Sequence, residues 1–331
     1  MKRVGITGPP GSGKTTLWRA VSGADTKGDV ATVAVADERL DKLTELHASR
    51  KTVPAQIELI DIHATAKTAA AAVARLRDVD ALVAVIPFFG GQDGRSEIAK
   101  MKDDLLLADM APVETRLQRA RKDPAGKKEV PSLEAAMHHL ENGSFMSSGA
   151  WETNDLQVFS PLALITLKPL IVVNNTDETG FDRADSEASR DKASDGGDFM
   201  EFSVSAALEA EVAGMSLEES RDLLEAFGVK EPVVGRVIQA VYGSLDLITF
   251  FTTGDDETRA WELRKGATAP EAAGVIHSDL QRGFIRAEVT TYEHVVETGS
   301  WDGAKAKGFV RVEGKEYIFQ EGDITHFRFA V

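Results

Sequence analysis

The sequence contains no cysteine among its 331 residues. This absence excludes disulfide scaffolds, thiol catalysis and zinc or iron–sulfur sites held by cysteine. No apolar run reaches roughly 18 residues, so a membrane-spanning segment is not expected. Basic residues are in the minority, with 38 Lys and Arg against 53 Asp and Glu, which gives a net charge of −15. Because nucleic-acid binding needs clustered cations, DNA is not expected as a partner, although a local basic patch is compatible with this charge.

The chain length corresponds to about two domains with room for an insertion, at roughly 150 residues per domain. A core of this size needs no disulfide or metal to hold it together. The first motif begins after seven residues, which leaves no space for a signal peptide. We therefore expect a cytoplasmic protein.

A phosphate-binding loop follows the short apolar strand Val4–Ile6. Residues Gly8–Thr15 fit the pattern G-x-x-x-x-G-K-[ST], and an amphipathic helix follows near Leu17. Glycines let the backbone wrap around phosphates, and the helix N-terminus favours their negative charge. In such loops the lysine, here Lys14, reaches the β- and γ-phosphates, and the hydroxyl of Thr15 binds Mg²⁺. The residues assigned to phosphate binding are Gly8, Gly11, Ser12, Gly13, Lys14, Thr15 and Thr16.

A second strand, Gln56–Asp61, ends in an aspartate. In GTPase-like domains this strand ends in D-x-x-G, where the Asp holds Mg²⁺ through water and the Gly amide contacts the γ-phosphate. Here Ala64 replaces the glycine. We assign Asp61 and Thr15 to the Mg²⁺ site, with an ordinary strand-end aspartate as the alternative. His63 lies where an attacking water would be held and is the candidate catalytic residue, with a surface histidine as the alternative.

Two further buried strands are predicted at 81–86 and 169–173, and a third at 201–204. After 169–173 a GTPase would have N-K-x-D, whose Asp binds guanine. Taking Asn175 as the Asn puts Glu178 in the fourth position, so guanine specificity is doubtful. The base-binding candidates are Asn175, Glu178 and the S-A-x loop Ser205, Ala206 and Ala207. The alternation of strands and helices predicts a mostly parallel sheet with the nucleotide at the carboxyl ends of its strands.

The sequence resembles the YchF-type, or Obg-like, ATPases, a family of the GTPase superclass that carries N-x-x-E as its fourth motif. The resemblance covers almost the whole chain and is most specific in its C-terminal third. The segments that carry it are 231–247, Thr249–Gly254, Gly266–His277, Gly283–Ala287 and His326–Val331. It implies ATP rather than GTP as ligand, a helical hairpin insertion, a C-terminal TGS-type β-grasp domain and the ribosome as partner.

Several motifs depart from the family pattern. The phosphate loop is kinase-like, and only residues 24–29 stand where the family has its first-switch stretch. The second switch lacks its glycine, as noted above. The segment Phe88–Ser96 contains no histidine, although the family has a histidine implicated in hydrolysis there. Nucleotide binding therefore carries over from the resemblance, whereas efficient hydrolysis does not.

Residues 98–158 interrupt the α/β alternation and show two helical patterns, which predicts the hairpin. Six basic residues between positions 116 and 128 face one acidic residue, Asp123, a local charge of +5. This patch is either a solvated hairpin tip or a contact to ribosomal RNA. Its members are Arg116, Arg119, Arg121, Lys122, Lys127 and Lys128.

The sequence thus predicts an α/β fold with a P-loop domain formed by 1–97 and 159–245, the hairpin 98–158, and a TGS-like β-grasp domain 246–331. In the last domain we expect strands at 247–252, 260–263, 285–289, 315–319 and 325–329 and a helix at 269–277. The expected function is a monomeric ATP-binding switch with slow Mg²⁺-dependent hydrolysis and a role at the ribosome. The alternatives are a nucleotide-dependent scaffold that does not hydrolyse ATP, and a small-molecule kinase, suggested by the phosphate loop alone.

Overall fold

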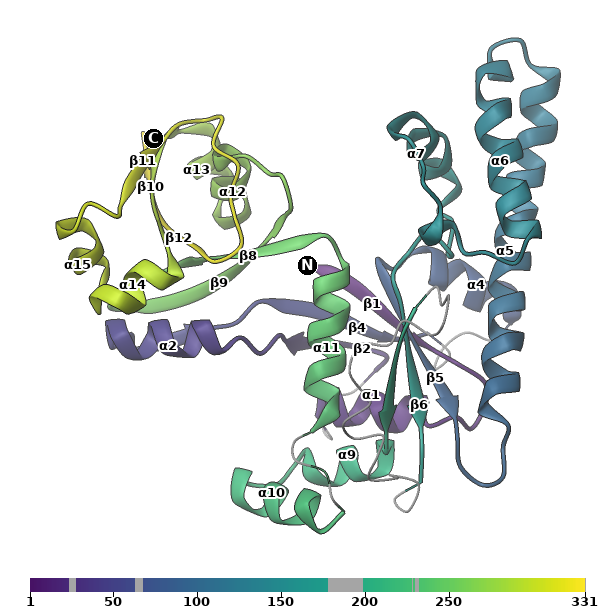
Figure 1. The fold of residues 1–331 in the computed structure, drawn as a ribbon, viewed down its shortest axis with the longest axis horizontal. Coiled ribbons are helices and arrows are strands. Elements are labelled where there is room, and N and C mark those ends of the chain that lie inside the picture. The colour runs from purple at the N-terminus through teal and green to yellow at the C-terminus, as the bar shows by residue number, and fades with distance from the viewer. Residues whose placement is uncertain (24–27, 63–67, 178–198, 228, 230–231, 331) are drawn as a thin grey trace. The chain divides into compact units, whose positions relative to one another are not determined.

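The structure, a computed structural model, describes residues 1–23, 28–62, 68–177, 199–227, 229 and 232–330 (Figure 1). The chain divides into two compact units. The larger consists of Lys2–Val33 and Glu58–Val241, and the smaller of Met1, Ala34–Ile57 and Tyr242–Val331. Among the described helices, none has both the length and the apolar character needed to cross a bilayer.

A six-stranded sheet forms the centre of the larger unit. Its order is β2 (Val30–Ala34), β4 (Gln56–Asp61), β1 (Lys2–Thr7), β5 (Ala81–Pro87), β6 (Leu170–Asn175) and β7 (Met200–Val204). The pairs β1–β5, β5–β6 and β6–β7 are parallel. Strands β5 and β6 are buried along their whole length, as expected for parallel strands covered on both faces. The predicted α/β fold and parallel sheet are therefore confirmed.

Helices connect these strands in the larger unit (Figure 1). Helix α4 (Ala69–Arg77) lies between β4 and β5 in the chain and begins at Ala69 because the side chain of Thr68 accepts a hydrogen bond from the amide of Ala71. Helix α1 (Lys14–Ser22) lies between β1 and β2 in the chain, and α9 (Ala206–Val212), α10 (Leu217–Ala226) and α11 (Val233–Ser244) follow β7, the last strand of this sheet.

The predicted hairpin is present. Its first arm, α5 (Gly94–Lys122), is one helix of 29 residues with Pro112 inside it. A 3-10 turn, η1 (Gly126–Glu129), leads into the second arm, α6 (Val130–Glu141). Helix α5 begins four residues earlier than predicted because the side chain of Asp93 caps it by accepting a hydrogen bond from the amide of Ser96. The short helix α7 (Thr153–Phe159) follows the hairpin.

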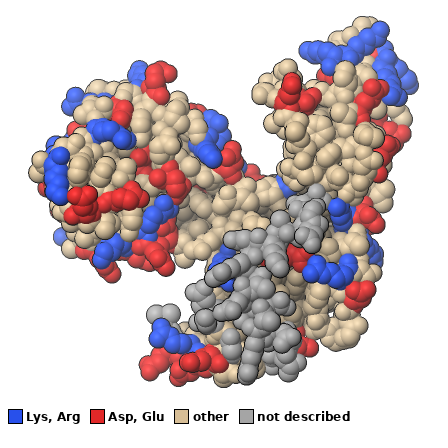
Figure 2. Space-filling model, viewed as in Figure 1, with Lys and Arg blue, Asp and Glu red and all other residues tan. Residues whose placement is uncertain are grey.

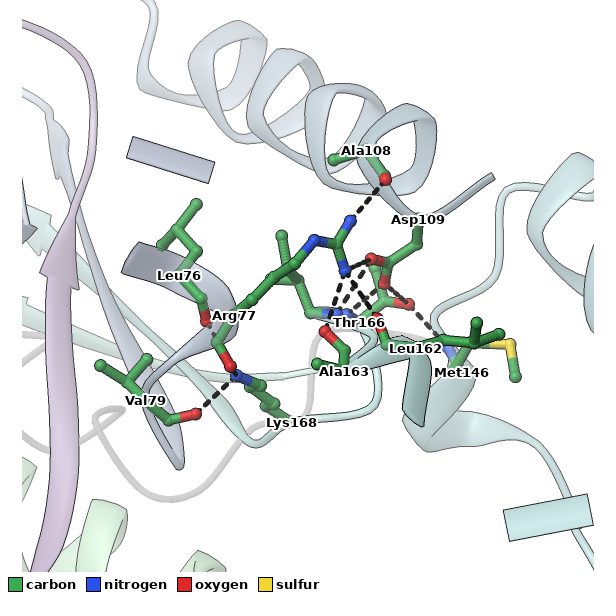
Figure 3. A network of polar contacts seen from close by, with 11 residues as sticks. Leu76, Arg77, Val79, Ala108, Asp109, Met146, Leu162, Ala163, Thr166 and Lys168 are labelled. Carbon is green, nitrogen blue, oxygen red and sulfur yellow. Dashed lines mark hydrogen bonds and ion pairs between the residues drawn. The ribbon is translucent and has the colours of Figure 1, made fainter. Parts of the chain in front are cut away.

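A buried polar network joins the middle of α5 to α4 and to the segment before β6 (Figure 3). The carboxylate of Asp109 on α5 is fully buried. It accepts hydrogen bonds from the amides of Ile165 and Thr166 at 3.0 and 2.7 Å and pairs with Arg77 at 3.0 Å. Because α4 supplies Arg77 and the segment before β6 supplies the amides, α5 is held at its middle by two other parts of the unit.

The ammonium group of Lys168 caps the C-terminal end of α4 in the same region (Figure 3). It donates to the carbonyl oxygens of Leu76, Arg77 and Val79 at 2.5–2.8 Å. The last carbonyls of a helix have no partner within the helix, so a cation at this end satisfies them. Burial lowers the pKa of Lys168 to about 8, although the negative charge of Asp80 opposes this shift.

The smaller unit contains a second six-stranded sheet. Its order is β11 (Arg311–Glu313), β10 (Phe284–Thr291), β12 (Asp323–Phe329), β8 (Leu247–Thr252), β9 (Glu257–Arg264) and β3 (Lys51–Val53). The rings of Phe250 and Phe319 meet edge to face at 5.1 Å in its core, to which α12 (Ala269–Ile276) contributes buried alanines. Four of the five predicted strands and the predicted helix are confirmed, with longer bounds for β9, β10 and β12.

The predicted strand at 315–319 is wrong. The described backbone forms there only an isolated bridge between Ile318 and Thr268. The flanking bonds run from the amide of Phe319 to the carbonyl of Ala267 and from the amide of Ala269 to the carbonyl of Tyr317. The segment therefore lies against the loop before α12 rather than along a strand. The elements α13 (Ser278–Arg282), α14 (Tyr292–Thr298), α15 (Trp301–Ala306) and β11 were not predicted.

The boundary between the two units also differs from the prediction. Residues 34–57 were assigned to the P-loop domain, but they pack in the smaller unit. They contain α2 (Glu38–His47) and β3, which pairs with β9 in parallel, Lys51 opposite Glu257. The guanidinium group of Arg39 on α2 pairs with Glu321 at 2.6 Å. Partners more than 200 residues apart give no local sequence signal, which explains the difference.

Candidate nucleotide-binding site

The loop after β1 has the backbone that phosphate binding requires. Gly8, Gly11 and Gly13 have φ angles of +140°, +75° and +92°, which side chains rarely tolerate. A Cβ atom on Gly8 would lie 2.2 Å from the carbonyl oxygen of Val85, and one on Gly13 would lie 2.2 Å from Nδ2 of Asn175. The loop is therefore packed so closely that only glycine fits at these two positions.

Lys14 is the first residue of α1 and points back over the loop. Its ammonium group donates a hydrogen bond to the carbonyl oxygen of Pro9 at 2.6 Å. The side chain is mostly buried, and burial lowers its pKa, while the carboxylate of Asp61 opposes this shift. A partly desolvated cation beside the start of a helix is well placed to bind an anion.

Thr15 and Asp61, the two residues assigned to Mg²⁺, lie within hydrogen-bond distance of each other. The hydroxyl of Thr15 donates to Oδ2 of Asp61 at 3.0 Å, and Asp61 is buried. Hydroxyl and carboxylate oxygens are ligands that Mg²⁺ prefers, and Mg²⁺ sites in nucleotide-binding proteins take further oxygens from phosphates and water. Within the described part of the chain, no group of three or more His, Asp or Glu could hold a metal without such help.

Asn175 connects two parts of the site. Its Nδ2 donates to the carbonyl oxygen of Ser12 at 2.8 Å, and its Oδ1 accepts from the amide of Ala206 at 2.9 Å. Asn174 instead bonds Oε2 of Glu201 at 3.0 Å. The geometry therefore supports Asn175 as the first residue of the fourth motif, which places Glu178 in the position that a GTPase gives to Asp.

A cavity of about 590 Å³ lies beside this connection. It brings together seven of the predicted nucleotide-binding residues: Gly11, Gly13, Thr16, Asn175, Ser205, Ala206 and Ala207. Four further lining residues were not predicted: Phe89, Gly90, Thr176 and Asp177. The sequence contains one signal that could have indicated Phe89, which is an aromatic residue next to glycines at the end of a buried strand. Gly8, Ser12, Lys14 and Thr15 belong to the loop and the start of α1 but do not line this cavity.

Two assigned residues lie outside the described residues. These are the candidate catalytic residue His63, within 63–67, and the motif residue Glu178, within 178–198. The same holds for Ala64 and for residues 24–27. Their roles stay predictions.

The cationic patch of the hairpin is partly neutralised. Arg116 pairs with Glu129 at 2.8 Å, and Arg121 pairs with Glu134 at 2.8 Å. Both glutamates lie just beyond the window that gave a charge of +5. Across the described residues, ion pairs are absent for the remaining four members, Arg119, Lys122, Lys127 and Lys128. Lys and Arg side chains gather at the end of the hairpin in Figure 2.

The chain is similar to known proteins along nearly its whole length. The family model YchF-GTPase_C, described as a protein of unknown function (DUF933), matches residues 247–330. The "Ribosome-binding ATPase YchF" of Haemophilus influenzae is 35% identical and that of Bacillus subtilis 36% identical, each over 99% of this chain and 99% of the relative. "Obg-like ATPase 1" of Schizosaccharomyces pombe is 30% identical over 98% of this chain and 94% of its own. The solved structure of the Schizosaccharomyces pombe YchF GTPase matches with a TM-score of 0.87 at 28% identity, over 99% and 97% of the two chains.

Proposed function

The chain belongs to the YchF family of Obg-like ATPases, and on this premise we propose that it is a Mg²⁺-dependent, ATP-preferring switch that hydrolyses ATP slowly and associates with the ribosome. The observation that carries the proposal is the connection made by Asn175 between the phosphate loop and the Ser205–Ala207 loop, beside the cavity of about 590 Å³. Phosphates bind at the loop and Lys14, Mg²⁺ binds at Thr15 and Asp61, and the base enters the cavity.

The preference for ATP follows from the register of the fourth motif. With Asn175 as its first residue, the position that contributes Asp to guanine binding is Glu178. A site that lacks a required hydrogen-bond partner rejects a base, because it leaves buried polar groups unpaired. The lining of the cavity by Phe89 supports a base-binding role, since an aromatic ring offers an apolar face to a purine.

Slow hydrolysis follows from the altered switch motifs. Phosphoryl transfer depends mainly on positioning and charge stabilisation. This chain has Ala64 in place of a glycine, no histidine in Phe88–Ser96 and a short segment at 24–29. His63 is the candidate that would position water. The same alterations favour the second candidate function, a scaffold that binds ATP without hydrolysing it.

Association with the ribosome is supported by the names of the curated relatives and by the unpaired cations of the hairpin. Phosphate groups of ribosomal RNA would contact Arg119, Lys122, Lys127 and Lys128. We also propose a cytoplasmic, monomeric protein, in keeping with this partner.

A phosphate-release assay with radiolabelled ATP, with and without ribosomes, tests the proposal. We expect a rate well below about 1 per second for the protein alone, and a higher rate with ribosomes. No release above background in either condition would favour the scaffold. A fast rate without ribosomes would contradict the interpretation of the altered switches.

A further inference from the structure

A second cavity lies on the side of the hairpin and shares no residue with the nucleotide cavity. Its volume is about 470 Å³, within the range of roughly 300–1,000 Å³ that ligand sites occupy. One wall comes from α5, η1 and α6, and the other from α7 and the 3-10 turn η3 (Ser160–Leu162) that follows it. The lining residues are Arg116, Lys128, Glu129, Ser132, Asn154, Gln157, Val158 and Pro161.

Contacts on either side hold this cleft in shape. The hydroxyl of Ser132 on α6 donates to Oδ1 of Asp155 on α7 at 2.6 Å. The same Asp155 takes part in a capping box with Glu152 at the start of α7. At the other end of α7, the buried ring of Phe159 packs edge to face against Trp151 at 5.1 Å. Helix α7 is therefore fixed beside the hairpin.

Three exposed polar groups in the cleft have no partner among the described protein groups. In the parts of the chain that the structure describes, the ammonium of Lys128 makes no ion pair and the carboxamides of Asn154 and Gln157 make no hydrogen bond. Arg116 occupies both carboxylate oxygens of Glu129, at 2.8 and 2.9 Å, so Glu129 does not neutralise Lys128. Asn154 and Gln157 are three residues apart on α7 and therefore lie on one face of it.

The chemistry of these groups identifies the class of ligand. A carboxamide presents a donor and an acceptor side by side, and this pair matches the edge of a nucleobase such as adenine. A free cation binds a phosphate, and the apolar wall formed by Val158 and Pro161 suits the face of a ring. A carboxylate group would use the cation but offers no donor to the carboxamide oxygens, whereas a phosphate and a base edge on one nucleotide match all three groups.

We propose that this cleft binds one nucleotide extruded from single-stranded RNA. Its phosphate contacts Lys128 and its base edge contacts Asn154 and Gln157. Proteins that read RNA sequence commonly bind unstacked bases in this way. The unpaired cations Arg119, Lys122 and Lys127 extend from the same end of the hairpin and would hold the neighbouring phosphates. This inference rests on the proposed association with ribosomal RNA and assigns the binding of one base to this cleft.

Fluorescence anisotropy with two labelled probes tests the inference. One probe is the single-stranded decaribonucleotide r(A)10, and the other is an RNA duplex of ten base pairs, whose bases are stacked and cannot enter the cleft. The variant is Asn154→Ala/Gln157→Ala, which removes both carboxamides. Both positions are exposed and helical, and alanine is a favourable residue in a helix. The matched control is Gln118→Ala, an exposed carboxamide on α5 that does not line the cleft.

We expect the double variant to bind r(A)10 at least tenfold more weakly, with less than a twofold change for the duplex and no change in the control. Lys128→Gln should lower the salt dependence of r(A)10 binding by about one unit of slope. Equal losses for both probes, or no loss for r(A)10, would overturn the inference. Tighter binding of a labelled Glu decapeptide than of r(A)10 would also overturn it and would assign the cleft to an acidic protein.

Failure of this inference is distinguishable from failure of the proposed function. Ribosome co-sedimentation that depends on Arg119 and Lys122 but not on the two carboxamides would keep the proposed function and exclude the nucleotide cleft. Loss of co-sedimentation for the wild-type protein, with r(A)10 binding intact and dependent on the carboxamides, would keep the cleft and exclude the ribosome.

Discussion

Replacing Asn175 by alanine should weaken ATP binding through the connection that its side chain makes. The substitution leaves the carbonyl oxygen of Ser12 and the amide of Ala206 without their partners at 2.8 and 2.9 Å. Asn175 is only 6% exposed, so water does not readily replace these bonds. A buried neutral group left unpaired costs about 1–3 kcal/mol, and two such groups give about 2–6 kcal/mol. This loss lowers the free energy of unfolding, and it weakens ATP binding because Asn175 no longer holds the phosphate loop and the Ser205–Ala207 loop together.

We expect the ATP dissociation constant to rise at least tenfold, which corresponds to about 1.4 kcal/mol. Titration calorimetry with Mg²⁺·ATP measures this change, and urea unfolding measures the decrease in the free energy of unfolding. Asn174→Ala is the matched control, because Asn174 is 7% exposed, adjoins Asn175 on β6 and bonds Glu201 without lining the cavity. It should change the dissociation constant less than threefold. Equal effects of the two substitutions, or an unchanged affinity in Asn175→Ala, would refute the role given to Asn175.

Three further predictions concern the hairpin, the buried lysine and catalysis. Charge reversal at Arg119 and Lys122 should abolish salt-sensitive ribosome co-sedimentation. Arg121→Gln should have little effect, because Arg121 is already paired with Glu134. Equal losses of co-sedimentation in the two variants would contradict this prediction. The pKa of Lys168 is about 8 in the folded chain and 10.5 in the unfolded chain, so the unfolded state binds more protons between these two pH values. The unfolding free energy of the wild type, measured relative to that of Lys168→Met, should therefore rise with pH across this window. A difference that stays constant in urea titrations would exclude this coupling. His63→Ala should lower ATP turnover at least tenfold at unchanged ATP affinity, about 1.4 kcal/mol of transition-state stabilisation, and an unchanged rate would remove His63 from the mechanism.

The elements that the sequence predicts well are those with a strong local pattern. The strands β5 and β6 are continuous apolar runs, and the loop from Gly8 to Thr15 is defined by glycines whose positive φ angles and close contacts the structure explains. Asn175 was assigned to the base site from its motif alone. Its position follows from the strand that carries it, because β6 ends at the same edge of the sheet as β1.

The features that the sequence does not predict depend on contacts between distant segments. The pairing of β3 with β9 joins residues 51–53 to residues 257–259, and nothing in either segment indicates it. The hairpin patch looked more cationic than it is, because the partners Glu129 and Glu134 lie just beyond it in sequence and become neighbours only when the hairpin folds. In the sequence, the segment that contains Phe89 stands out only for the histidine that it lacks, and the place of Phe89 in the cavity depends on the folding of distant segments around it.

The central claim, an ATP-preferring nucleotide site, is tested most directly by one calorimetric comparison. Mg²⁺·ATP and Mg²⁺·GTP are titrated into the wild-type protein under identical conditions, with Lys14→Ala as the control that loses the principal side-chain cation of the phosphate site. We predict tighter binding of ATP than of GTP and no measurable binding of either by the control. Equal or tighter binding of GTP by the wild-type protein would contradict the account.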